Sequence, residues 1–102
     1  MDKILQTEIN SIDELIENGD LDKAVSRLKV IAQDYPQEGV VAYYLGRICL
    51  MGKDGALALK YFLAAIDRGY ATADVYLSTA MLQKNLAALN EAEKFFIKAT
   101  EV

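Results

Sequence analysis

The sequence predicts an all-α fold, an α-solenoid built from three antiparallel helix pairs. Three observations predict it. Apolar residues recur at helical spacing along all 102 residues, scattered glycines and one proline interrupt that spacing at short intervals, and like residues recur 34 positions apart. No segment shows the strict apolar–polar alternation of a half-buried strand.

The first helix pair is delimited by residues that end or begin helices. The first stripe of apolar residues covers 9–16 and ends before Gly19, because glycine accepts the left-handed conformation found at helix ends. Asp20 is the expected N-cap of a second helix with apolar residues spaced over 21–32. Pro36 closes that helix, since the residue before a proline is disfavoured in the helical region.

The other four helices follow from the same signals. Gly52, Gly69 and Asn85 are stop signals, and Asp54 is the expected N-cap of the fourth helix. The expected ranges are about 40–51, 55–68, 72–84 and 89 to the chain end. Short connections between helices of this length predict antiparallel hairpins that stack in chain order.

The 34-residue period places small and bulky residues in register. The aligned sets are Ala24, Ala58 and Ala92; Leu28, Phe62 and Phe96; Ile31, Ala65 and Ala99; and Ile12, Gly46 and Ala80. A small residue lets two helices approach closely, and a bulky residue one turn away fills the space beside it. One hairpin alone cannot bury such a face, so we expect a single domain over 1–102 with units at about 5–38, 39–72 and 73–102.

In the second unit these residues form a known motif. Leu45-Gly46, Cys49, Ala58, Phe62 and Ala65 stand in the order of the Leu-Gly, Tyr, Ala, Phe, Ala signature of the tetratricopeptide repeat. The sequence therefore resembles the tetratricopeptide repeat (TPR) family over nearly its whole length. The stretch 64–73 is also similar to the related Sel-like repeats. Either resemblance implies a right-handed superhelix of helix pairs.

Three features depart from the TPR pattern. The first unit has Ile12 where the family has a small residue and Glu8 where it often has an aromatic one. After the second unit, Gly69-Tyr70 replaces the proline of the family. The first unit therefore fits the family pattern least well.

Composition argues against several classes of function. The net charge is −4, which disfavours nucleic-acid binding, and the absence of histidine removes the usual general base and the commonest metal ligand. Cys49 is the one cysteine and lies in an apolar stretch, where a buried, unreactive thiol is expected. We therefore expect no enzyme activity, no metal, no cofactor, no nucleic-acid partner and no membrane span. With no signal peptide, a cytoplasmic location is expected.

The TPR resemblance implies a scaffold for protein–protein interaction, in which the first helices of successive units line a concave surface. The residues it assigns to this surface are Ile9, Asp13, Tyr43, Arg47, Leu50, Met51, Leu77, Met81 and Lys84. Methionine and tyrosine adapt to irregular partners, and arginine and tyrosine are enriched at binding hot spots. The hypothesis is that a protein or peptide partner, a hydrophobic segment or an amphipathic helix, binds there and places an acidic group on Arg47. Alternatively, several of these side chains pack only against neighbouring helices.

The same resemblance excludes one kind of partner. Some TPR domains hold the C-terminal carboxylates of heat-shock chaperones with a clamp of lysine, arginine and asparagine side chains. The corresponding positions here are Ile9, Asp13, Tyr44, Asp74 and Ser78. Acids replace clamp residues at two of them and no basic pair remains, so binding of a chaperone tail by that clamp is not expected.

A second function is suggested by the last predicted helix. TPR arrays usually end in an additional polar helix, which would leave Leu82, Leu86, Phe95, Ile97 and Val102 on or near an uncapped edge. Assembly as a homodimer through this edge, truncation from a longer array, or tolerated partial exposure would each account for it.

Overall fold

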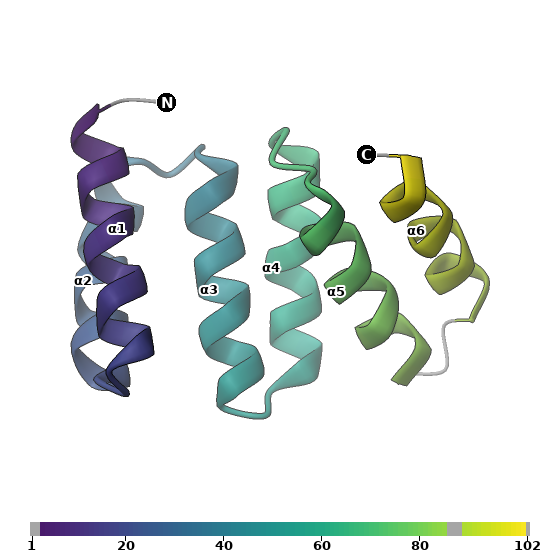
Figure 1. The fold of residues 1–102 in the computed structure, drawn as a ribbon, viewed down its shortest axis with the longest axis horizontal. Helices are drawn as coiled ribbons and strands as arrows, with labels where there is room; N and C mark the ends of the chain where they lie inside the picture. The colour runs from purple at the N-terminus through teal and green to yellow at the C-terminus, as the bar shows by residue number, and fades with distance from the viewer. Residues whose placement is uncertain (1–2, 86–88, 102) are drawn as a thin grey trace. The chain divides into compact units, whose positions relative to one another are not determined.

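The computed structural model describes residues 3–85 and 89–101, and all of its secondary structure there is helical. The six predicted helices are present, with bounds that follow the expected stop and start signals (Figure 1). They are α1 (Lys3–Glu17), α2 (Leu21–Asp34), α3 (Gly39–Met51), α4 (Gly55–Asp67), α5 (Ala73–Asn85) and α6 (Leu89–Glu101). This confirms the all-α class and the division into helix pairs.

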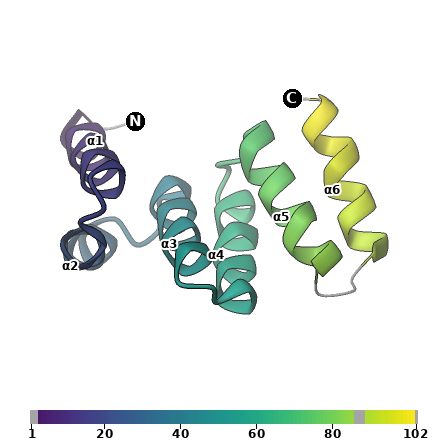
Figure 2. The same ribbon diagram turned by 60° about the horizontal axis from the view of Figure 1, so that its bottom comes forward.

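The chain forms two compact units, Met1–Gln37 and Glu38–Val102, each described below by itself. The first contains α1 and α2. The second contains α3 to α6, which lie side by side in chain order, each antiparallel to the next (Figures 1 and 2). The single domain and the superhelical hand expected from the sequence stay predictions.

Charge is distributed unequally between the two units. Residues 1–37 hold four Lys or Arg against eight Asp or Glu, whereas residues 38–102 hold seven of each. The whole net charge of −4 is therefore carried by the first unit, and the second unit is neutral.

Three helices end in the same hydrogen-bonded motif, with one residue in the left-handed conformation. Gly19 (φ 80°) ends α1, Lys53 (φ 63°) ends α3 and Gly69 (φ 91°) ends α4. At the end of α3, Asp54 N donates to Cys49 O at 2.9 Å and Lys53 N donates to Leu50 O at 3.0 Å. This pattern satisfies two carbonyls that have no partner within the helix.

The two aspartates predicted to be N-caps differ in their bonding. Asp54 caps α4 as predicted, since its side chain accepts a hydrogen bond from Leu57 N at 3.1 Å. Asp20 stands at the N-cap position of α2, but its side chain makes no capping hydrogen bond. Both helix starts were therefore predicted correctly from the sequence, but only Asp54 makes the capping hydrogen bond.

The first unit buries one stripe of each helix. The buried residues are Leu5, Ile9 and Ile12 on α1 and Ala24, Leu28 and Ile31 on α2. Arg27 Nη1 on α2 donates to Ser11 Oγ on α1 at 2.7 Å and lies 4.0 Å from Glu8 Oε2. The backbones of α1 and α2 approach less closely than those of the other two pairs, which agrees with Ile12 in the column that holds Gly46 and Ala80.

The second unit is organised around a close approach of α3 to α4. A Cβ atom at Gly46 would lie 2.8 Å from Phe62 Cε1, well inside contact distance. Phe62 is almost fully buried and packs with Ala58 and Leu82, so its ring joins α4 to α5 as well as to α3. A second cluster of Ala42, Ala65 and Val75 connects the same three helices.

Two polar side chains are buried on α5. Thr79 Oγ1 donates to Val75 O at 2.7 Å, which satisfies its hydroxyl within the helix. Gln83 is 5% exposed, and its Oε1 has no hydrogen-bond partner in the part of the chain that the structure describes. Apolar residues on α5 therefore show little helical periodicity, because its buried face includes Thr79 and Gln83 and its exposed face includes Leu77 and Met81.

The Gly46–Phe62 contact leads to a first prediction. We expect Gly46→Ala to lower the free energy of unfolding by about 1 kcal/mol, because overpacking costs about 1–3 kcal/mol and exceeds the helix-propensity gain of alanine. Chemical denaturation measures the change. Gly55→Ala is the control: its Cβ would meet Leu82 Cδ2 at an ordinary 3.5 Å, so no loss is expected. Phe62→Leu should recover part of the loss in the double variant, and equal stability of Gly46→Ala and the parent would contradict the argument.

The left-handed residue Lys53 leads to a second prediction. Lys53→Gly should raise the free energy of unfolding by about 1 kcal/mol, because a side chain at positive φ is strained and glycine is not. Lys53→Ala removes the same charge but keeps a Cβ atom, so it should give no comparable gain. Urea denaturation of both variants tests this. A gain shared equally by the alanine variant would mean that loss of the charge, not relief of strain, stabilises the chain.

Candidate protein-binding surface

The second unit contributes one stripe of the predicted surface from α3. Tyr43, Arg47, Leu50 and Met51 are spaced at four, three and one positions, which places them on one side of the helix. Leu50 is 42% exposed and Met51 is 44% exposed, whereas Tyr43 and Arg47 are half-buried. The apolar part of this stripe is therefore available at the C-terminal end of α3.

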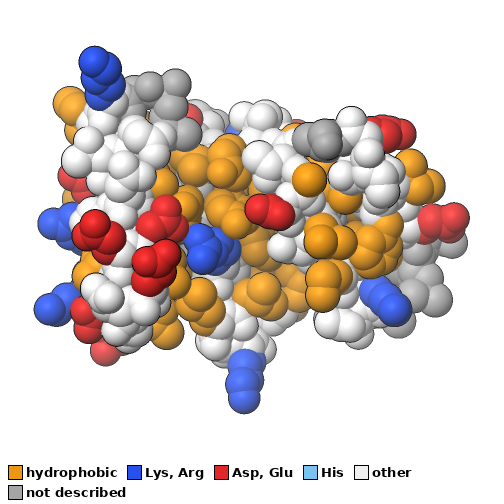
Figure 3. Space-filling view, viewed as in Figure 1, with side chains coloured by type: hydrophobic (Ala, Val, Ile, Leu, Met, Phe, Trp, Pro, Cys, Tyr) orange, Lys and Arg blue, Asp and Glu red, His pale blue; other side chains and the backbone are white. Residues whose placement is uncertain are grey.

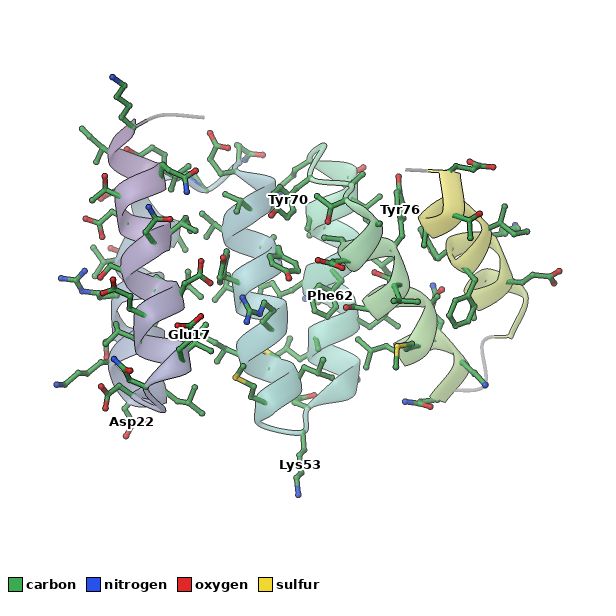
Figure 4. The ribbon with its side chains drawn as sticks, in the orientation of Figure 1. Glu17, Asp22, Lys53, Phe62, Tyr70 and Tyr76 are labelled. Carbon is green, nitrogen blue, oxygen red and sulfur yellow. The ribbon has the colours of Figure 1, made fainter. Side chains whose placement is uncertain are left out.

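Tyr43 is held by other rings rather than extended into solvent. Its ring centroid lies 5.2 Å from that of Tyr44, 5.9 Å from that of Phe62 and 5.3 Å from that of Tyr70. Figure 4 labels two of these partners, Phe62 on α4 and Tyr70 in the α4–α5 connection. Tyr43 therefore packs against neighbouring side chains, which is the alternative that the sequence analysis gave for part of the predicted surface.

Arg47 lies over two aromatic rings. Its Cζ is 5.8 Å from the ring centroid of Tyr43 and 5.2 Å from that of Tyr44. A guanidinium group is attracted to the negative face of an aromatic ring, which restricts its orientation. The rings therefore fix the place of a positive charge on the exposed side of α3.

A second stripe comes from α5. Asp74, Leu77, Met81 and Lys84 share one side of the helix, and all four are exposed. Leu77 is 44% and Met81 53% exposed, while Val75 and Thr79 on the opposite side are fully buried. On the face shown in Figure 3, hydrophobic side chains gather over α3 and α5. We call the exposed residues Leu50, Met51, Leu77 and Met81 the α3/α5 surface.

The first unit holds the two remaining predicted residues. Ile9 is 3% exposed, so it is a core residue of this structure and its side chain presents no surface for a partner. Helical spacing could not reveal this, because Ile9 continues the apolar stripe and an exposed stripe has the same period as a buried one. Asp13 is half-buried.

The proposed edge at the last helix is smaller than expected. Leu82 is buried against Ala58 and Phe62, which corrects the expectation that it lies on an open edge. Phe95 stacks on Tyr76 with ring centroids 5.8 Å apart, and Ile97 is 52% exposed. The other two edge residues, Leu86 and Val102, lie outside the described residues. Self-association through α6 stays a prediction.

A shallow cavity of about 540 Å³ lies between α1 and α2, away from the predicted site residues. Its lining residues are Ser11, Leu15, Asp22, Lys23, Ser26 and Arg27. Both signs of charge are present, and Arg27 is already bonded to Ser11. We therefore read it as the ordinary polar seam of a helix hairpin rather than a ligand site.

Cys49 is less buried than the sequence predicted, and its reactivity stays a prediction. It is half-buried, and its pKa is raised by burial and, to a smaller extent, by the negative charge of Asp54. A raised pKa leaves little thiolate near neutral pH, and the thiolate is the nucleophilic form. Within residues 3–85 and 89–101, no three Cys, Asp or Glu side chains are grouped closely enough to hold a metal ion. No described helix is both long and apolar enough to cross a bilayer.

Known proteins resemble this chain in structure rather than in sequence. No family model matches the sequence, and no curated protein matches it. The second TPR domain of Spaghetti (RPAP3), solved with the HSP90 peptide SRMEEVD, matches with a TM-score of 0.81 at 15% identity, covering 92% of this chain and 87% of that domain. The first TPR domain of the same protein, bound to the same peptide, also gives 0.81, at 17% identity over 94% and 76% of the two chains.

Structures of MamA are also similar. A double mutant of MamA gives a TM-score of 0.80 at 14% identity, covering 94% of this chain and 54% of that one, so this chain spans about half of it. Identities this low establish a shared fold and nothing finer. The structural likeness confirms the fold expected from the repeat: the chain has the helix-pair fold of tetratricopeptide repeat domains.

Proposed function

We propose that this chain is a protein-interaction module that binds an apolar peptide or helical segment on the α3/α5 surface. The observation that carries the proposal is the exposure of Leu50, Met51, Leu77 and Met81, between 42% and 53%, on the first helices of two stacked pairs. Large apolar side chains gathered on one face are a common mark of a protein-binding site. The same face holds Lys84, which is exposed and can receive an acidic group of a partner.

The size of the surface sets the expected strength of binding. Burying a whole leucine or methionine side chain contributes about 1.5–3 kcal/mol, so the exposed half of each of these four contributes about 1 kcal/mol. The total of about 4 kcal/mol is near the lower limit of the cost of association. Apolar contact alone therefore gives weak binding, and charged groups around the surface must add affinity and specificity.

The structural relatives support this proposal at the level of the fold. Two RPAP3 domains with this fold were solved with a peptide bound, so the fold can accommodate one. The residues that would hold such a peptide's carboxylates are absent here, however. Tyr44 is buried and Asp74 is acidic and exposed, so we expect a partner that differs in chemistry from that peptide.

A matched set of variants tests the surface. Leu77→Asp and Met81→Asp should each lower partner capture from cells of the native host at least tenfold, because an unpaired carboxylate would be buried in the interface. Leu63→Asp, on α4 and 38% exposed, is the control and should leave capture unchanged. Circular dichroism checks that all three fold. Tyr43→Ala is not suitable, because it removes core contacts. Equal capture by all variants would contradict the proposal.

The peptide SRMEEVD provides a separate test of partner chemistry. We expect no saturable binding at peptide concentrations up to about 1 mM, which corresponds to about 4 kcal/mol of binding free energy. Fluorescence anisotropy with a labelled peptide measures it, with an RPAP3 TPR domain as the positive control and a scrambled peptide as the negative one. Saturable binding that the unlabelled peptide displaces would show that this chain holds carboxylates by residues other than the known clamp.

A further inference from the structure

The α3/α5 surface is bounded by opposite charges at its two ends. Asp74 lies in the first turn of α5 and Lys84 in its last turn, with Leu77 and Met81 between them on the same side. Ten residues of helix separate the two charges, a distance of about 15 Å along the axis. Neither side chain makes an ion pair or a hydrogen bond within the described part of the chain.

Lys53 adds a second positive charge at the same end as Lys84. It lies in the connection that follows α3, and α3 and α5 run in the same direction in both views of the ribbon (Figures 1 and 2). Figure 4 shows the Lys53 side chain extending from this end of the unit. Asp54 follows Lys53 at the same end, and its carboxylate accepts the capping hydrogen bond of α4 from Leu57 N. The C-terminal ends of α3 and α5 therefore carry two lysines against this one acid, whereas the N-terminal end of α5 carries Asp74.

The apolar centre of the surface favours a helical occupant over an extended one. Leu50, Met51, Leu77 and Met81 supply no hydrogen-bonding groups, and the backbone groups of α3 and α5 are paired within their helices. Arg47, on the same side of α3, is the one donor side chain of this stripe, and it lies over the rings of Tyr43 and Tyr44. An extended peptide laid on such a surface would lose water from its own N–H and C=O groups without gaining partners. A helix satisfies these groups internally and presents only side chains.

We propose that the α3/α5 surface binds an amphipathic helix of about 10–14 residues that lies antiparallel to α3 and α5. Acidic residues in its first turn lie beside Lys53 and Lys84, and a basic residue in its last turn lies beside Asp74. This inference rests on the proposed function and adds the conformation, charge pattern and direction of the partner.

The direction follows from two effects that act together. A helix is stabilised by acids in its first turn and bases in its last turn, because of the dipole of its backbone. In the antiparallel orientation each of those charges meets its opposite on this chain. In the parallel orientation the same helix would place its acids beside Asp74 and its bases beside Lys84 and Lys53. A single helix therefore gains in stability and in affinity only when it binds antiparallel.

A displayed library of 14-residue helical peptides tests the inference. Every member carries a randomised apolar stripe, half of the library has acids in the first turn and bases in the last, and the other half has them exchanged. Selection on the full chain should enrich the acid-first half about three- to tenfold over the base-first half, as expected for a few exposed charge pairs. Selection on Asp74→Lys/Lys84→Asp should reverse that preference while both proteins remain folded by circular dichroism.

The outcomes separate this inference from the proposed function. If both halves are enriched equally on the parent chain and lost on Leu77→Asp, the surface binds helices but the charge pattern and direction proposed here are wrong. If nothing is enriched on the parent relative to Leu77→Asp, the proposed function and this inference both fail. A spin label at one end of an enriched peptide then reports direction independently, since antiparallel binding places the acidic end nearest the amides of residues 50–54.

Discussion

The contact between Gly46 and Phe62 is the constraint on which the second unit depends. Only a residue without a side chain lets α3 come this close to the ring of Phe62, and the ring fills the space that the glycine leaves. The ring also reaches Leu82, so the same side chain fixes how α5 lies against α4. In the first unit, the position equivalent to Gly46 is occupied by Ile12. The backbones of α1 and α2 lie further apart than those of α3 and α4. The spacing of a hairpin is therefore set by the size of one side chain.

The same packing explains why a binding surface remains on α3 and α5. The second helix of the pair supplies Phe62 to the interior, where the first helix presents Gly46. Leucine and methionine can then occupy the opposite, exposed side of the first helices without being needed in the core. Tyr43 lies at the border of the two regions, in ring contact with Phe62 while sharing a stripe with Leu50. Core and surface are thus coupled, and substitutions at Tyr43 cannot be read as surface changes alone.

Most of the fold was predictable from the sequence, whereas the site was predictable only in part. Helix starts and ends follow from local chemistry, which is why Gly19, Asp54 and Gly69 marked them correctly. Lys53 in a left-handed conformation carries no such signal, because lysine rarely adopts it. The exposed stripe of α5 agrees with the predicted residues, but Ile9 is buried. Burial of a single position depends on which helices meet there, and the period of one helix does not contain that information.

The uneven distribution of charge has a consequence for how a partner arrives. All of the net charge of the chain resides in residues 1–37, so the long-range field that attracts or repels an approaching molecule originates there. The neutral second unit offers no such field, and its charges act only within about one Debye length, roughly 8 Å at physiological ionic strength. The charges of the second unit therefore contribute to discrimination among partners mainly once the two surfaces are in contact. Selectivity on this surface is expressed mainly in how long a complex lasts rather than in how fast it forms.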